Sequence, residues 1–323
     1  MTTTQEHCDR RPKPDTPAAR HAGYQLGDYA TQGYLALVGR LVLCFHGLTV
    51  PEWPWLVAAH AAGLLAVHAL VRAHSRYPGR RWLDFLRHFY PVLLYTALFC
   101  ETSHINLMFA DRYLDPEFIR LEAWVFGCQP AILFMEKLPY LAVSELFYFA
   151  YFSYYLMIVG VGVALYWQDR GRFFHFLTVT TVLFYGCYLV YVFLPVIGPH
   201  IFFESFPGYP TPPEWEVQPL AVTPVFPEAV FAGPFFQIMK VVYTNFGSTG
   251  AAFPSSHVAV AVCTLYFSRR YLPRWRWIHG TFVVLLCLST VYCRYHYAVD
   301  VLAGLAMAAV FIPLGNWLYK KSL

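Results

Sequence analysis

The chain has 323 residues, of which 58% are hydrophobic, 19% aromatic and 13% charged, and its formal net charge is only +4. Because soluble domains carry about 25% charged residues, this composition excludes a water-soluble enzyme, a disordered chain and a nucleic-acid-binding protein. The mean hydropathy of +0.43 predicts a polytopic membrane protein, since helices in a bilayer need apolar residues on their outer faces as well.

The polar segment 1–32 has neither the apolar stretch nor the cleavage site of a signal peptide, and we expect it to be a cytoplasmic tail. After it, eight apolar stretches reach or approach the length of about 20 residues that a helix needs to span a bilayer. They run over 33–50, 53–72, 89–109, 141–166, 173–194, 255–272, 277–293 and 296–319. The sequence therefore predicts an all-α transmembrane bundle of about eight spans.

The positions of the basic residues orient this bundle. Of the 23 Lys and Arg, 17 lie in the tail, in the connections after the second, fourth and sixth stretches, and at the C-terminus. All of these segments are on one side of an eight-span topology, and the positive-inside rule places that side and both termini in the cytoplasm. Five cations remain for the other side: Arg112, Arg120, Lys137, Lys240 and Arg294.

Two long connections then lie on the non-cytoplasmic side. Residues 110–140 mix charged with apolar side chains, and we expect this loop to lie in the membrane interface. Residues 195–254 hold 11 of the 23 prolines, and loops of this length are usually lids, binding loops or linkers. The predicted parts after the tail are two N-terminal helices with a basic loop at 33–88 and a six-helix catalytic core at 89–323.

Two segments contain residues suited to chemistry. The first is F-P-S-S-H at 253–257, which opens the sixth stretch, and the second is S-T-V-Y-C-R-Y-H-Y-A-V-D at 289–300. Pro254 suits the first turn of a helix, where its missing N–H costs nothing. The N–H groups that follow it, together with the hydroxyls of Ser255 and Ser256, would form an anion-binding site at the helix N-terminus.

His296 and Asp300 are four residues apart and share one face of a helix, so the carboxylate can orient the imidazole and raise its basicity. This is the arrangement of a nucleophile with its orienting group. In the eight-span topology His257 and His296 lie at outer helix ends, in the same layer. Together with the anion site they predict phosphoryl transfer. The alternatives are an ordinary helix cap for the Pro-Ser-Ser run and ordinary helix packing for the His-x3-Asp pair.

P-S-S-H followed by H-x3-D-V-x-A-G resembles the second and third signature motifs of the type 2 phosphatidic acid phosphatase superfamily. The stretch S-T-V-Y-x3-H-Y-x2-D and the form F-P-S-x-H are similar to the branch that contains inositol phosphorylceramide synthases and their bacterial relatives. The resemblance covers about residues 110–320, and it implies a six-helix core to which two N-terminal helices have been added.

The resemblance also implies a role for each matching residue. His296 attacks phosphorus and forms a phosphohistidine, and Asp300 orients it. His257 protonates the leaving alkoxide and then activates the acceptor, while Ser255 and Ser256 bind phosphate oxygens. The family mechanism needs no metal ion and no other cofactor.

The chain departs from the superfamily in its cationic residues. The first motif, K-x6-R-P, is absent, and His200 stands near its expected place, while Thr290 replaces the Arg of the third motif. A phosphate in a partly dry site needs compensating charge. Arg294, Lys240, His200 and Thr290 are therefore candidate phosphate-binding residues. The alternative for Arg294 and Lys240 is an interfacial side chain whose charge reaches water.

Polar residues inside predicted spans are expensive in a bilayer and therefore mark functional candidates. Glu101, His104 and Asn106 in the third stretch, with Glu145 near the start of the fourth, form a candidate headgroup or acceptor site. The alternative is helix packing through hydrogen bonds. We interpret four tyrosines of the fourth stretch as packing and interfacial residues: Tyr148, Tyr151, Tyr154 and Tyr155.

We therefore predict an integral membrane enzyme that transfers a phosphoryl or phospho-alcohol group from a lipid, through a phosphohistidine, on the non-cytoplasmic face. The expected partners are a membrane lipid and an alcohol acceptor, such as inositol or another lipid, with neither a nucleic acid nor a protein partner. One alternative is a lipid phosphatase, in which water is the acceptor. A second alternative is a non-catalytic protein that binds or moves lipids on the same scaffold.

Overall fold

Most of the residues that the structure describes are in helices. The structure is a computed structural model, and it describes residues 23–203 and 227–322. Within these ranges the β-pairing is limited to an isolated bridge between Val196 and Ala251. The all-α prediction is confirmed. Residues 1–22 of the predicted tail and 204–226 of the second long loop lie outside the described residues.

A long helix forms at each of the eight apolar stretches. These helices are α2 (Leu26–Phe45), α3 (Trp53–Arg76), α4 (Arg81–Ile105), α7 (Leu141–Gln168), α8 (Arg170–Phe193), α12 (Ser256–Tyr271), α13 (Arg276–Tyr292) and α14 (Ala298–Lys321). The two long connections hold α5 (Asp115–Phe126), α6 (Pro130–Lys137), α9 (Pro199–Phe202), α10 (Glu228–Phe231) and α11 (Pro234–Phe246), and a 3-10 turn, Pro273–Trp275, joins α12 to α13.

Several of these helices have the length and composition of membrane spans. Among the described residues, α3, α7, α8 and α14 are by themselves long and apolar enough to cross a membrane. The pair α5 and α6, bent by 67° at the break between them, adds a fifth candidate as a broken span or re-entrant loop. α12 and α13 have only 16 and 17 residues, fewer than the ~20 of a full span. The chain is an integral membrane protein, and the total of eight spans remains a prediction.

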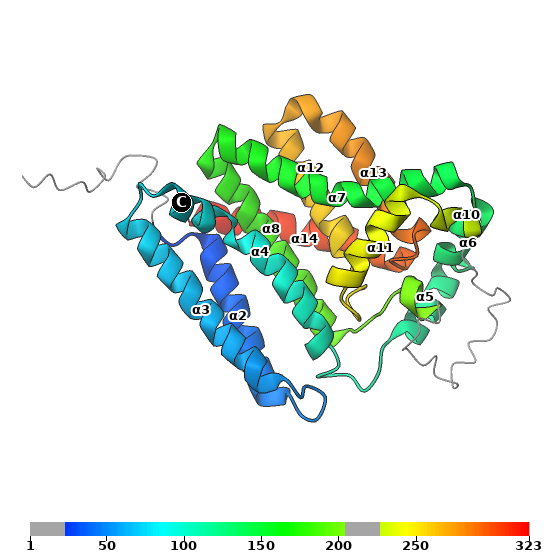
Figure 1. The fold of residues 1–323 in the computed structure, drawn as a ribbon, viewed down its shortest axis with the longest axis horizontal. Coiled ribbons are helices and arrows are strands. Elements are labelled where there is room, and N and C mark those ends of the chain that lie inside the picture. Colours follow the sequence, from blue (N-terminus) through cyan, green and yellow to red (C-terminus); the bar gives the residue numbers. More distant parts are fainter. Residues whose placement is uncertain (1–22, 204–226, 323) are drawn as a thin grey trace, which may run out of the picture.

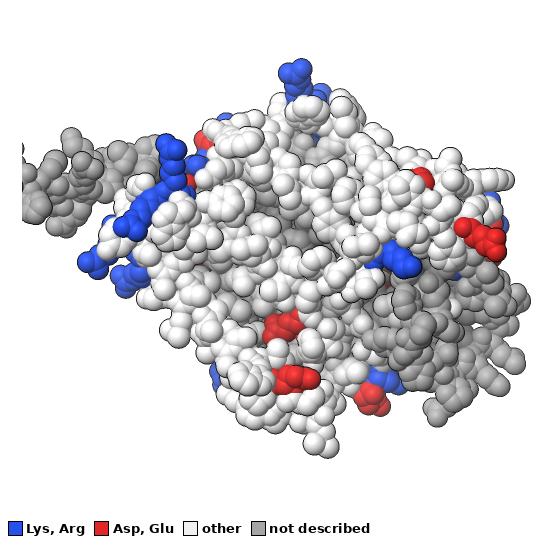
Figure 2. All heavy atoms as spheres, viewed as in Figure 1, with Lys and Arg blue, Asp and Glu red and all other residues white. Residues whose placement is uncertain are grey.

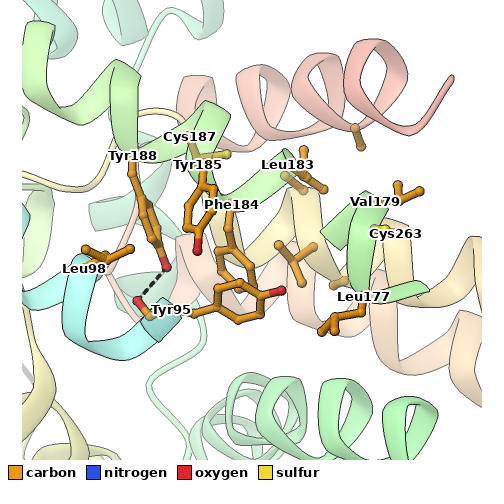
Figure 3. Packing of buried hydrophobic residues seen from close by; sticks show 14 of the residues in the cluster. Tyr95, Leu98, Leu177, Val179, Leu183, Phe184, Tyr185, Cys187, Tyr188 and Cys263 are labelled. Carbon is orange, nitrogen blue, oxygen red and sulfur yellow. Dashed lines mark hydrogen bonds between the residues drawn. The ribbon is translucent and has the colours of Figure 1, made fainter. Parts of the chain in front are cut away.

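Helix α8 is the centre of the bundle and packs against α2, α4, α7, α12 and α14 (Figure 1). Its most apolar segment is 78% buried, more than that of the other three candidate spans. The Tyr188 hydroxyl of α8 donates to the Tyr95 carbonyl oxygen of α4 at 3.0 Å (Figure 3), and the Tyr95 hydroxyl lies 2.6 Å from Thr181 Oγ1. Such bonds satisfy polar groups that water cannot reach inside a bilayer.

A buried ion pair joins the N-terminal helices to the core. Asp28 of α2 accepts a hydrogen bond from Arg87 of α4 at 2.5 Å and another from the Tyr90 hydroxyl at 2.5 Å, and all three residues are buried. Asp28 also accepts the backbone N–H of Gln25 at 2.7 Å. α2 consequently begins at Leu26, inside the predicted tail, because the polar residues there are bonded to the protein instead of being solvated.

Helix α5 is amphipathic, as predicted for the first long connection, but two of its three acidic residues face inward. Asp115 and Glu122 have no exposed surface, whereas Trp124 is 83% exposed. An outer face of apolar and aromatic residues suits a helix that contacts the membrane. Figure 2 shows a largely uncharged surface, with Lys and Arg gathered at the end that holds the C-terminus and the α3–α4 connection.

Candidate active site

The two signature segments meet at the N-terminal ends of α12 and α14. The backbone N–H of Ser255 donates to the carbonyl oxygen of Asp300 at 3.0 Å. Gly304, one turn further along α14, permits this approach, because a Cβ there would lie 2.5 Å from the Ser255 carbonyl oxygen. Close packing of the two helices therefore explains the glycine of the D-V-x-A-G motif.

The N-terminus of α12 differs from the predicted anion site. The helix begins at Ser256 with Ser255 as its N-cap, so Pro254 precedes the cap instead of occupying the first turn. Ser255 Oγ accepts a backbone N–H of the helix at 3.4 Å, and the Ser256 N–H donates to the Tyr191 hydroxyl at 3.3 Å. The backbone N–H groups of Ser255 and Ser256 are thus bonded within the protein. Of the three N–H groups in the predicted anion site, that of His257 is the one that the described contacts leave to bind an anion.

His296 lies in the loop between α13 and α14, and its Nδ1 is fixed by two acceptors. This nitrogen lies 2.9 Å from the Ala252 carbonyl oxygen and 3.3 Å from Asp300 Oδ2. Because a carbonyl oxygen can only accept, Nδ1 carries the proton and Nε2 keeps its lone pair. Burial lowers the pKa of His296 to about 4, so the ring is neutral at neutral pH. Nε2 is therefore available as a nucleophile.

His257 faces His296 across the site. The Nδ1 atom of His257 lies 3.5 Å from His296 Nε2, and its Nε2 lies 3.1 Å from the Tyr151 hydroxyl. The ring of Tyr154 packs on His257 with 4.5 Å between the ring centroids. The tertiary structure thus brings the two predicted histidines together, with Nε2 of His296 and Nδ1 of His257 directed at one another.

Three buried carboxylates hold the loops around the histidines. Asp300 Oδ2 accepts the Tyr297 N–H at 2.9 Å and caps α14. Asp115 accepts the N–H groups of Ile197 and Gly198 at 2.8 and 2.9 Å and the Tyr297 hydroxyl at 2.9 Å. Glu122 accepts an N–H of the first turn of α14 at 2.9 Å. Asp115 and Glu122 were not predicted, although their spacing places them on one face of the amphipathic segment.

Tyrosines supply other groups around the acid–base candidate. The Tyr151 hydroxyl that contacts His257 also lies 2.5 Å from the Tyr243 hydroxyl of α11. The Tyr243 ring stacks on Tyr295 at 3.9 Å, and the His200 ring lies 5.0 Å from that of Tyr295. The interpretation of the α7 tyrosines as packing and interfacial residues is thus incomplete, because Tyr151 is buried and contacts a candidate catalytic residue.

The predicted phosphate-binding residues lie in different surroundings. Arg294 is fully buried two residues before His296, and its φ is 60°. The Thr290 hydroxyl donates to a carbonyl oxygen of its own helix at 2.8 Å, and the Thr290 carbonyl oxygen accepts the His296 N–H at 3.0 Å. Lys240 is exposed on α11. Arg294 is therefore a buried cation in the loop 293–297, which bears the candidate nucleophile His296 and is called the nucleophile loop below. Thr290 positions that loop through its backbone.

The candidate headgroup residues are bonded to separate partners. Glu101 lies 3.5 Å from Nε2 of His60 on α3, and Asn106 Nδ2 donates to a backbone carbonyl oxygen at 2.5 Å in the segment before α12. Glu145 accepts two N–H groups of the first turn of α11 at 2.8 and 3.2 Å, and His104 is exposed. These contacts fit the alternative of helix packing, and Glu145 holds the helix that bears Tyr243.

An apolar cavity of about 180 Å³ lies between α4, α7 and α8 and ends at Ser256 and His257. Its walls include Phe99 of α4 and Ile158 of α7. Figure 3 shows Tyr95, Phe184 and Tyr188, which close the cavity on the side of α4 and α8. The cavity is therefore lined both by helices of the bundle and by His257, the candidate acid–base residue.

A family model described as the PAP2 superfamily matches residues 116–314, which is more than half of the chain. The chain belongs to the PAP2 superfamily. Members of the PAP2 superfamily are generally phosphatases or phosphotransferases. The match confirms the family resemblance of the motifs, and the matched range contains His257, His296 and Asp300.

Two curated relatives support the PAP2 assignment. The chain is 36% identical over 76 residues to a PA-phosphatase related-family protein of Dictyostelium discoideum, an alignment that covers 24% of this chain and 13% of that protein. It is 32% identical over 68 residues to the catalytic subunit of inositol phosphorylceramide synthase of Schizosaccharomyces pombe, which covers 21% of this chain and 16% of that protein. The alignments thus span less than a fifth of either relative. No solved structure matches the chain.

Proposed function

We propose that this PAP2-superfamily protein is a membrane enzyme that transfers a phosphoryl or phospho-alcohol group from a lipid through a phosphohistidine at His296. One observation carries the proposal: His296 Nε2, whose lone pair is assigned by the Nδ1–H bond to Ala252, lies 3.5 Å from Nδ1 of His257. A nucleophile and an acid–base group that face one another across a narrow space meet the geometric requirement for transfer in two steps.

His296 and His257 together account for the bonds and the proton that move in the two steps. In the first, His296 Nε2 forms a bond to phosphorus, the P–O bond to the lipid alcohol breaks, and His257 gives its proton to the leaving oxygen. In the second, the acceptor oxygen attacks phosphorus, its proton passes to His257, and the N–P bond breaks. Arg294 and the N-terminus of α12 compensate the charge on the phosphoryl oxygens.

The apolar cavity supports a lipid as the substrate. It lies between helices of the membrane bundle and ends at His257, so a hydrocarbon chain in it would bring the phosphate of the same molecule to the histidines. A small polar phosphate would gain little from aromatic and aliphatic walls. The distribution of basic residues supports a site on the non-cytoplasmic face, with both termini in the cytoplasm.

The acceptor decides between a transferase and a phosphatase. The form of the third motif and the similarity to an inositol phosphorylceramide synthase favour an alcohol acceptor. The similarity to a PA-phosphatase related protein favours water, and we keep this as the second candidate.

Lipid-product mass spectrometry tests both candidates. Purified protein is incubated in mixed micelles with a phosphodiester lipid labelled in its headgroup, with and without ceramide as the alcohol acceptor. We expect the labelled headgroup phosphate to appear on the acceptor, and His296→Ala to abolish this product while the variant stays folded. A parallel incubation uses a long-chain phosphomonoester lipid, and release of inorganic phosphate from it, without transfer from the phosphodiester to ceramide, would identify a phosphatase. Turnover that survives His296→Ala would reject the mechanism, and no turnover by the folded wild type would favour the non-catalytic alternative.

A further inference from the structure

The hydrogen-bond donors and acceptors around the two histidines can be assigned one after another, starting from the carbonyl oxygen of Ala252. The Ala252 carbonyl oxygen only accepts, so His296 donates from Nδ1 at 2.9 Å and presents a lone pair on Nε2. His257 Nδ1, 3.5 Å from that lone pair, is consequently a donor, which leaves His257 Nε2 as an acceptor. The Tyr151 hydroxyl, at 3.1 Å, therefore donates to His257 Nε2.

Tyr243 continues this chain toward the surface. The oxygen of Tyr151 gives its hydrogen toward His257 and accepts one from the Tyr243 hydroxyl at 2.5 Å. Tyr151 is completely buried on α7, whereas Tyr243 is partly exposed on α11. The hydrogen bonds thus run in one direction, from the hydroxyl of a partly exposed residue, through that of a buried one, to the acid–base histidine.

We propose that the hydroxyl groups of Tyr243 and Tyr151 form a proton relay that supplies His257 when it acts as the general acid. The inference rests on the proposed function and adds two positioning residues to it. It deepens that function by naming the route of the proton between His257 and water.

Each transfer in the relay replaces the hydrogen that the next group gives up. As the P–O bond to the lipid alcohol breaks, the Nδ1 hydrogen of His257 passes to the leaving oxygen. Nε2 of His257 takes the hydrogen of Tyr151, Tyr151 takes that of Tyr243, and Tyr243 takes one from a hydronium ion or a protonated buffer. When the acceptor hydroxyl attacks, its proton returns along the same route in the opposite direction.

The position of His257 explains why a relay is useful there. It is the second residue of α12, where the positive end of the helix dipole disfavours an imidazolium ion. The aromatic rings of Tyr151 and Tyr154 also pack on it, with centroids at 4.9 and 4.5 Å. Through the relay the ring can give a proton from one nitrogen while it gains one at the other, without first becoming charged.

Two substrates with different leaving groups test the relay. A long-chain alkyl phosphate needs its leaving oxygen protonated, whereas the acidic phenol of p-nitrophenyl phosphate leaves without a proton. With the alkyl phosphate we expect Tyr151→Phe to lower kcat by about 100-fold, within the range of general acid catalysis, and to leave KM unchanged. With p-nitrophenyl phosphate the same variant should stay within about twofold of the wild type. Tyr243→Phe should give the same contrast.

Tyr148→Phe is the matched control, because Tyr148 is equally buried on α7, one turn before Tyr151, and its ring packs against Phe236 and Tyr295. It should keep the wild-type kcat on both substrates. Equal losses on the two substrates for Tyr151→Phe, or no loss on the alkyl phosphate, would overturn the relay. If the wild type turns over neither these two substrates nor the phosphodiester lipid of the proposed function, the proposed function fails, and the two failures are thereby distinguished. Thermal unfolding of each variant confirms that it is folded.

Discussion

His296 donates from Nδ1 to the carbonyl oxygen of Ala252 at 2.9 Å, a shorter contact than the 3.3 Å to the carboxylate of Asp300. Ala252 is itself held by Val196, whose carbonyl oxygen accepts the Ala252 N–H at 2.8 Å. The tautomer of the candidate nucleophile is therefore set by backbone that links the end of α8 to the start of α12, with the carboxylate as a second acceptor.

Replacing Asp300 with Asn is expected to lower kcat by about 10- to 100-fold, the usual effect of losing an orienting partner. The loss should stay below the roughly 10⁴-fold effect that follows where one carboxylate alone sets the tautomer, because Ala252 still accepts from Nδ1. Steady-state kinetics with the lipid donor, alongside His296→Ala, measure the difference. A loss equal to that of His296→Ala would show that the carboxylate controls the ring.

Gly198→Ala should displace the nucleophile loop. Gly198 has a φ of +97°, and a Cβ there would lie 2.8 Å from the carbonyl oxygen of Tyr295, next to the nucleophile. We expect kcat to fall by about 100-fold, as for a displacement of about 1 Å. Gly127→Ala is the control, since Gly127 also has a positive φ, +68°, but open space around it. Gly127→Ala should lower the melting temperature and leave kcat unchanged. Equal losses of kcat in the two variants would show that contact between the Cβ added at position 198 and the Tyr295 carbonyl oxygen is not the cause.

The pH dependence of kcat/KM should show that His296 is neutral at neutral pH. Because burial lowers its pKa to about 4, Nε2 keeps its lone pair above that pH and loses it below. With a phosphodiester lipid, which does not titrate near neutrality, kcat/KM should hold down to about pH 5 and then fall with acid. An acid limb centred at 6.5, the ordinary value for a histidine, would contradict this assignment. Circular dichroism at each pH excludes unfolding.

Arg294→Ala is expected to lower kcat/KM by about 2 kcal/mol or more, because this guanidinium is fully buried two residues before the nucleophile. Arg294→Lys keeps the positive charge but loses the planar guanidinium that can donate two parallel hydrogen bonds. It should therefore retain more activity than Arg294→Ala. Arg120→Ala removes an exposed arginine of α5 and serves as the control. A wild-type kcat/KM for Arg294→Ala would remove this residue from phosphate binding.

The N-terminal helices should depend on one ion pair for their attachment. Asp28→Ala leaves the buried charge of Arg87 without its carboxylate, and we expect the free energy of unfolding to fall by about 3–5 kcal/mol. The double variant Asp28→Leu with Arg87→Met should be destabilised less, because no unpaired charge remains buried. Unfolding in detergent, followed by heat or denaturant, measures both. A double variant that loses as much stability as Asp28→Ala would show that the unpaired charge of Arg87 is not the cause of the loss.

Much of the fold was predictable because its signals are local. Apolar runs of span length predicted all eight long helices, and the motifs at 253–257 and 289–300 predicted the facing histidines. The start of α2 was not predicted, because Asp28 is buried by a partner on α4. The place of Pro254 also differed, since Ser255 caps α12 and the helix begins at Ser256.

The sequence by itself determined the membrane character of this protein, its helices, its family and the identity of its histidine pair, because hydropathy, periodicity and short motifs depend on neighbouring residues. Only the tertiary structure decided what surrounds that pair. The carbonyl oxygen of Ala252, the hydroxyl of Tyr151 and the carboxylate of Asp115 reach the site from segments far apart in the chain. Hydrogen bonds between such segments leave no periodic trace in a sequence, and they form only where helix packing brings the donor and the acceptor within about 3 Å of one another.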